Sequence, residues 1–92
     1  MSSLQAACAT AMQTEGVLGV MCVDPQGLCL HSEGKVSDSS SGAVAAMANQ
    51  SRALLGGDAV VTVESSQGKI LLSRCEGATV AIFMAAKAAP AN

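Results

Sequence analysis

The residue best suited to act as a general base is His31, the only histidine in the chain. Nucleophilic catalysis needs a serine or cysteine, a base beside it and a third group that orients the base. No carboxylate stands at a sequence spacing that clearly serves His31, so we interpret it as a half-exposed histidine on a strand. The sequence therefore predicts no catalytic residues.

The acidic residues and paired glycines have structural explanations as well. Asp24, Asp38 and Asp58 each neighbour Pro, Ser or Gly, where turn-forming and capping roles account for them. Gly56-Gly57 follows a helical pattern and no lysine comes after it, so it does not form a phosphate-binding loop. We therefore expect a non-enzymatic protein without a cofactor.

Four cysteines, Cys8, Cys22, Cys29 and Cys75, raise the question of a disulfide or a metal site. A disulfide framework is not expected without a secretory signal. Zinc sites use close pairs such as Cys-x-x-Cys, whereas six residues separate the closest two cysteines here. We interpret all four as reduced, partly buried small hydrophobic residues and predict no metal site. A thiol enzyme using Cys22 or Cys29 would need a depressed pKa and an adjacent base, and the sequence indicates neither.

The composition limits the chain to one small domain, residues 1–92. Half of the residues are apolar, but Phe83 is the only aromatic one. Aromatic rings bury the largest areas, and a core of small aliphatic side chains in a domain of this size is marginal by itself. This composition favours a partner chain that supplies additional burial.

Charge and hydropathy exclude several classes of partner. The net charge is −2 and the five basic residues are scattered singly, whereas nucleic-acid binding needs a clustered basic face. No apolar run approaches the ~18 residues of a membrane span, and the start of the chain does not resemble a signal peptide or a lipidation site. We expect a cytoplasmic protein with no nucleic-acid partner and no direct membrane insertion.

Apolar periodicity predicts a helix and a hairpin in the first half. Residues 2–14 carry an apolar stripe from Leu4 to Met12, and Ser2 with Gln5 fits a capping box. Residues 17–23 read as a central strand with two apolar faces, and Asp24 to Gly27 fits a type I turn. Residues 28–31 form the returning strand, with Cys29 and His31 on the same face.

The turn leaves the register of this hairpin open. A two-residue loop places Cys22 opposite Cys29, whereas a bulge at Gly27 places Cys22 opposite Leu30. A type I turn followed by glycine favours the bulge, and so we expect no thiol pair there.

The second half reads as a helix and three strands. After a serine-rich loop, Ser37 or Asp38 caps a helix of about residues 39–55, ended by Gly56-Gly57. Strands follow at 59–64, 69–75 and 78–84, and a tail from about residue 86 to 92 is expected to fray. The order α-β-β-α-β-β-β indicates an α+β domain with one antiparallel sheet of five strands and two helices.

Two surfaces could serve for interaction. The second helix is rich in alanine, which permits close approach of another helix. Val60 to Val63 is β-branched and would favour pairing with another chain if it lay at a sheet edge. An interior strand explains the same residues equally well.

An ordered set of residues resembles the hepatitis B virus X-interacting protein family, a small-subunit type of the Ragulator (LAMTOR) complex. The set spans about residues 16–82 at nearly constant spacing. It comprises Gly19-Val20, Cys22, Asp24, Gln26-Gly27-Leu28, Leu30, Gly34, Ser37-Asp38, Gly42, Gln50, Glu64-Ser65, Gly68, Ile70, Gly77 and Thr79-Val80-Ala81.

The resemblance implies a roadblock fold and a scaffold role. Such a subunit would pair with another roadblock subunit as a heterodimer within a pentameric complex. A lipidated subunit would hold that complex on the lysosomal surface, where it recruits Rag GTPases for amino-acid signalling to the TOR kinase complex. A homodimeric roadblock-type regulator that binds a small GTPase or motor directly is the alternative.

In roadblock dimers the second helices pack together and the third strands pair edge to edge. Carried over to this sequence, the partner interface comprises Val44, Met47, Ser51, Leu55, Val60, Val61, Thr62, Val63 and Glu64.

Overall fold

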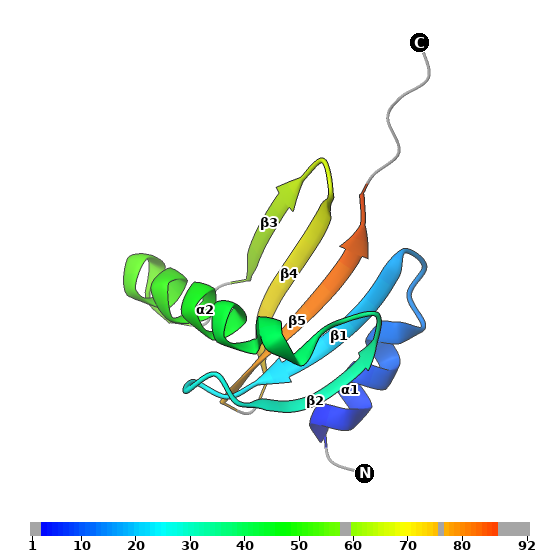
Figure 1. Cartoon of the computed structure of the whole chain (residues 1–92). Coiled ribbons are helices and arrows are strands. Elements are labelled where there is room, and N and C mark those ends of the chain that lie inside the picture. Colours follow the sequence, from blue (N-terminus) through cyan, green and yellow to red (C-terminus); the bar gives the residue numbers. More distant parts are fainter. Residues whose placement is uncertain (1–2, 58–59, 76, 87–92) are drawn as a thin grey trace.

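The computed structural model describes residues 3–57, 60–75 and 77–86. Helix α1 (Ser3–Met12) precedes the strands β1 (Val17–Val23) and β2 (Cys29–Gly34). A short 3₁₀ turn, η1 (Asp38–Ser40), leads into helix α2 (Ser41–Leu55). Strands β3 (Val61–Ser65), β4 (Gly68–Cys75) and β5 (Ala78–Ala85) complete the domain (Figure 1). The predicted element order and the α+β class are confirmed.

The five strands form one antiparallel sheet in the order β2-β1-β5-β4-β3. The β1–β2 hairpin and the β3–β4–β5 meander are joined through the pairing of β1 with β5. Strands β2 and β3 therefore lie at opposite edges of the sheet (Figure 1).

Each helix covers one face of the sheet, because side chains alternate along the strands. On the α2 face, Met21 and Val23 of β1 pack with Val44 of α2 and Leu72 of β4. On the opposite face, Cys8 of α1 packs with Val20 and Cys22, the β1 residues that alternate with Met21 and Val23, and with Val80 of β5. Both faces of β1 are buried, which agrees with its uninterrupted apolar sequence.

The ends of α2 follow local sequence signals. The Ser37 side chain accepts a hydrogen bond from the Ser39 amide and so caps η1, from which α2 continues at Ser41. At the other end, Gly56 adopts a φ of 71° and its amide donates to the Arg52 carbonyl at 2.8 Å. The capping role expected of Ser2 and the fraying expected of the tail beyond residue 86 fall outside the described residues.

The turn between β1 and β2 has the predicted bulge at Gly27, but a second irregularity changes the register. The Gly27 amide donates to the Asp24 carbonyl, Asp24 pairs with Leu28, and Gly27 has a φ of 94°. Val23 then faces Cys29, whereas Cys22 faces His31, which makes Leu30 an extra residue in β2.

Two register predictions are therefore wrong. Cys22 does not lie opposite Leu30, and Cys29 and His31 do not share a face. Cys29 packs against the core under α2, while His31 lies on the α1 face near Cys8. The physical cause is the extra residue, because one inserted residue reverses the alternation of side chains along a strand. The expectation of no pair between Cys22 and Cys29 is confirmed.

Glycine is required where β1 and β2 approach most closely. Gly34 faces Gly19 across the ladder and has a φ of 80°. A β-carbon at Gly34 would lie 2.4 Å from the Leu18 carbonyl oxygen and 2.9 Å from the Gly19 α-carbon. Both the conformation and the space exclude other residues without a local rearrangement.

Candidate partner-binding surface

Strand β3 has one side that no described strand covers. It pairs with β4 from Val61 opposite Leu72 to Ser65 opposite Gly68. Because β3 is last in the sheet order, its outer row of backbone groups is available for pairing with another chain. Between the two interpretations of Val60 to Val63, the structure supports the edge strand.

Exposed apolar side chains gather where α2 ends and β3 begins. Leu54 and Leu55 close the helix, and Val60 and Val63 lie before and within the strand; all four side chains are exposed. Figure 1 shows the end of α2 and the start of β3 on the same side of the molecule. We call these four residues and the outer edge of β3 the α2–β3 surface. A cluster of this kind, next to an open strand edge, is typical of an interaction surface.

The residues predicted for the interface differ in how much surface they offer. Leu55, Val60, Thr62, Val63 and Glu64 are exposed. The other four predicted residues are less accessible: Val44 is buried, and Met47, Ser51 and Val61 are half-buried.

Val44 is 1% exposed and belongs to the core, so it presents no surface to a partner in this structure. Met47 and Val61 are half-buried and pack against the same core. The sequence alone does not show which helix residues face the sheet, because that depends on how α2 is rotated against it. Leu54, which was not assigned to the interface, is among the most exposed apolar residues described.

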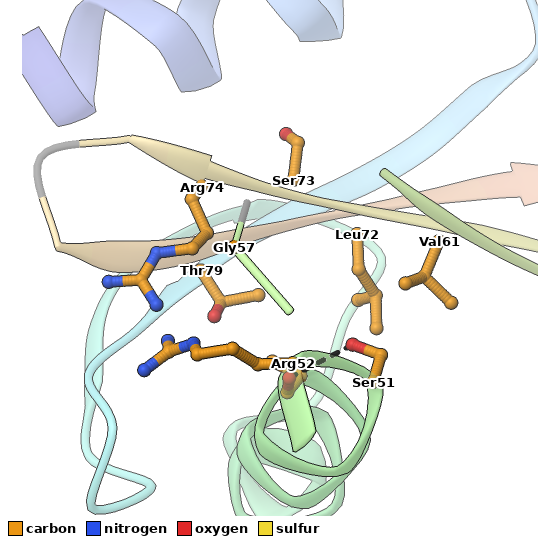
Figure 2. A pocket seen from close by; sticks show the side chains of 9 residues that line it. Ser51, Arg52, Gly57, Val61, Leu72, Ser73, Arg74 and Thr79 are labelled. Atoms are coloured by element: carbon orange, nitrogen blue, oxygen red, sulfur yellow. Dashed lines mark hydrogen bonds between the residues drawn. The ribbon is translucent and has the colours of Figure 1, made fainter. Parts of the chain in front are cut away.

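A small cavity lies beneath the end of α2 (Figure 2). Ser51, Arg52, Val61, Leu72 and Thr79 are among the residues that line it. Its volume is about 10 Å³, which is roughly the space that one water molecule needs. The cavity is therefore too small for an organic ligand.

Positive charge borders this cavity. Arg52 of α2 and Arg74 of β4 extend their guanidinium groups to the same side of it (Figure 2). The Arg52 Nε atom is buried and has no hydrogen-bond partner among the described residues. The Arg74 guanidinium donates to the Gly77 carbonyl at 3.5 Å. Two basic groups thus lie beside the cavity under the end of α2.

A wider hollow lies at the other end of β3, near the turn into β4. Val63, Ile70, Phe83 and Leu18 are among its lining residues, and its volume is about 270 Å³. Val63 belongs to both the hollow and the α2–β3 surface, so the two are continuous. An apolar recess beside an open strand edge can accept an anchoring side chain from a partner.

The environments of Cys8, Cys22 and Cys29 make their thiols poor nucleophiles. Burial raises the pKa of Cys22 to about 12, and the hydrogen bond with Cys8 adds to the effect. Burial also raises the pKa values of Cys8 and Cys29. A reactive thiol needs a depressed pKa. The structure therefore gives no support to a thiol enzyme based on Cys22 or Cys29.

The family of the chain follows from its sequence as a whole. Residues 2–84 match the model of the family described as Ragulator complex protein LAMTOR5. The chain belongs to the LAMTOR5 family. The resemblance to a Ragulator small subunit is thereby confirmed. Membership of this family assigns the chain to a multi-protein complex and to a regulatory rather than an enzymatic class.

Solved structures identify the LAMTOR5 fold of this chain as roadblock/LC7. A roadblock/LC7 domain from Streptomyces avermitilis superposes with a TM-score of 0.73 at 17% identity, covering 85% of this chain and 74% of that one. The gliding protein MglB from Thermus thermophilus gives 0.74 at 13% identity, with 88% and 70% covered. Myxococcus xanthus MglB gives 0.72 at 15% identity, with 92% and 77% covered. At such identities the similarity establishes the fold alone.

Neither described helix of this LAMTOR5-family chain has the length and apolar character that crossing a membrane requires. The longer of the two, α2, spans 15 residues, against the roughly 20 that a bilayer demands.

Proposed function

We propose that the chain is a scaffold subunit that pairs with another roadblock subunit through the α2–β3 surface. The observation that carries this proposal is the open edge of β3 beside the exposed apolar side chains at the end of α2. Membership of the LAMTOR5 family supports it, because a Ragulator subunit must present surfaces to other chains.

The proposed pairing joins two physical contributions. A partner strand placed along β3 satisfies its outer backbone groups and continues the sheet into the second subunit. A partner helix beside α2 covers Leu54 and Leu55, each of which contributes about 1.5–3 kcal/mol when fully buried. Val63 and the hollow beside it extend the same contact along the strand.

Within this proposal, the pair is part of a pentameric Ragulator-type complex on the lysosomal surface. A lipidated partner subunit attaches the complex to the membrane. The assembled complex recruits Rag GTPases and so supports amino-acid signalling to the TOR kinase complex. The family match is the basis for these steps, and the chain contributes binding surfaces rather than chemistry.

Charge-bearing substitutions on the α2–β3 surface and, as controls, in and beside β2 provide a matched test. Leu55→Glu and Val63→Glu alter side chains that are 68% and 42% exposed on the α2–β3 surface. The controls, Leu28→Glu and Leu30→Glu, alter side chains that are 62% and 45% exposed at the β2 edge. All four positions are exposed, so the fold should tolerate each change.

The measurement is co-purification of each tagged variant with the other Ragulator subunits, identified by mass spectrometry. We expect the Leu55 and Val63 variants to lose their partner, because a buried carboxylate without a counter-ion opposes association. The Leu28 and Leu30 variants should bind normally. Equal binding by all four would refute the proposed interface. Recovery of a homodimer with a bound small GTPase or motor, and without Ragulator subunits, would instead identify a direct regulator.

A further inference from the structure

Three potential metal ligands, Cys8, His31 and Glu33, meet on the α1 face of the sheet, and the thiol of Cys22 lies beside that of Cys8. Cys8 of α1 and Cys22 of β1 are fully buried, and their Sγ atoms are 2.9 Å apart. On β2, the His31 Nε2 atom lies 2.9 Å from the Glu33 Oε2 atom. One ligand atom each of Cys8, His31 and Glu33 lies within 4.8 Å of the other two.

The backbone explains why these side chains converge. The extra residue Leu30 turns His31 to the α1 face, directly opposite Cys22 in the ladder. Glu33 follows two residues later and so shares the face of His31. Helix α1 packs on the same face and directs Cys8 into the cluster. Three separate elements thus supply donors to one point, which no short sequence motif encodes.

From this arrangement we propose that Cys8, Cys22, His31 and Glu33 bind a zinc ion. Two sulfurs, an imidazole nitrogen and a carboxylate oxygen make a four-ligand set that suits tetrahedral Zn²⁺. Magnesium and calcium prefer all-oxygen sites, and thiolate ligands select softer ions. Two thiolates also balance the charge of the ion, so that the buried sulfurs do not remain uncompensated.

In the structure the cysteines pair with each other and His31 pairs with Glu33, so zinc binding requires these side chains to leave their present contacts. In tetrahedral zinc sites the metal–sulfur and metal–nitrogen distances are about 2.3 Å and 2.0–2.1 Å. Zinc between Cys8 and Cys22 would therefore separate sulfurs that now share a thiol hydrogen bond. His31 and Glu33 are partly exposed, which gives the ion a route from solvent.

The site is independent of the proposed partner interface. The α2–β3 surface lies at the β3 edge, whereas the cluster lies between α1 and the β1–β2 hairpin at the other edge. Zinc bound here would tie the first helix to the hairpin and stabilise this half of the domain. Loss of zinc binding and loss of partner binding are consequently separable results.

Zinc itself is the probe for the test. The purified full-length chain, freed of metal with a chelator and kept reduced, is titrated with Zn²⁺ against a competing chromophoric chelator. We expect one equivalent to bind and circular dichroism melting to shift upward. Cobalt in place of zinc should give the near-ultraviolet absorption of thiolate-to-cobalt charge transfer, which reports sulfur ligation directly.

Three single variants test the sulfur and imidazole ligands, and a fourth is the control. Cys8→Ala, Cys22→Ala and His31→Ala should each weaken zinc affinity at least about tenfold. Cys29→Ala changes a cysteine of the same hairpin that faces the other core, so its affinity should remain that of the unchanged chain. His31 is partly exposed, which keeps the test valid even if a core cysteine variant fails to fold.

Three outcomes would overturn the proposal. The first is no stoichiometric zinc binding by the reduced chain. The second is equal affinity in the His31→Ala and Cys29→Ala variants. The third is a Cys8–Cys22 disulfide that persists in reducing buffer and blocks the titration, since the pair would then be a covalent cross-link.

Discussion

At the residue scale, the environment of each side chain decides properties that its type alone does not. The four cysteines illustrate this, because Cys8 and Cys22 are fully buried while Cys29 and Cys75 are partly accessible. The glycines illustrate it too: Gly34 is wedged against β1, whereas a side chain at Gly42 would meet open space.

Replacing two glycines should change stability in opposite directions. Gly34→Ala should lower the free energy of unfolding by at least about 2 kcal/mol, because alanine disfavours the left-handed backbone and its β-carbon meets Leu18 and Gly19. Gly42→Ala should raise it by up to about 1 kcal/mol, since alanine has a higher helix propensity than glycine and has space in the first turn of α2. Urea denaturation of both variants measures the two changes, and equal effects would contradict the close approach at Gly34.

The reactivity of Cys29 should respond to its acidic neighbour. Burial raises the pKa of this thiol, and the Asp38 carboxylate, 3.7 Å away, raises it further by opposing the negative thiolate. Asp38→Asn should therefore lower the pKa and speed alkylation of Cys29 near pH 8. Iodoacetamide labelling followed by peptide mass spectrometry gives the rate, with Cys75 as the internal control. An unchanged Cys29 rate would show that Asp38 has no electrostatic influence on it.

At the element scale, periodicity predicted most of the fold from the sequence. The apolar stripe of α1 from Leu4 to Met12 packs as expected on the α1 face. The strands of the second half begin and end within two residues of their predicted bounds. These elements are determined by local patterns, and local patterns are what a single sequence displays.

Other features could not be predicted, because they depend on contacts between distant segments. Nothing in the residues around Leu30 marks it as an inserted position, yet it decides that His31 meets Cys22. Cys8 joins that cluster only because α1 packs on one face of the sheet and not the other. The depth of Val44 likewise depends on how α2 is rotated against the sheet, which its alanine-rich sequence leaves undetermined.

Proline in the two edge strands should distinguish a paired edge from a free one. Val61→Pro removes a backbone donor and places a ring in β3, so partner binding should be lost if a partner strand pairs along β3. Leu30→Pro alters the extra residue of the β2 bulge, a position at which proline is tolerated, and should leave binding intact. Partner co-purification and circular dichroism report binding and folding. A folded Val61→Pro variant that binds normally would exclude edge pairing at β3.

At the scale of the whole molecule, stability is divided between two thin cores. Each is built from small aliphatic side chains and cysteines on one face of the sheet, with Phe83 at the margin of the α2 side. A chain of this size buries a modest fraction of its surface, and the α2–β3 surface leaves further apolar area uncovered. Association with another chain is the evident source of additional burial.

The isolated chain should consequently self-associate or be only marginally stable. Sedimentation velocity at increasing concentration is the appropriate measurement, with the Leu55→Glu variant as the comparison. We expect the unchanged chain to shift to a larger species with concentration, and the variant to sediment as a monomer. A stable monomer of the unchanged chain at high concentration, with a melting temperature typical of larger domains, would contradict this expectation.

The pairing of β1 with β5 sets the order in which a newly made chain can fold. The strand that completes the middle of the sheet is the last one to be synthesised, and its neighbour β1 is the first. While β5 is inside the ribosome, the β1–β2 hairpin and the β3–β4 hairpin are not joined through the sheet. The edge of β1 that later pairs with β5 is then unpaired. Folding of the sheet must therefore wait until β5 has been made, and it depends on contacts of high sequence separation. Premature termination a few residues before β5 should yield a chain that is degraded, whereas loss of residues beyond β5 should spare the sheet.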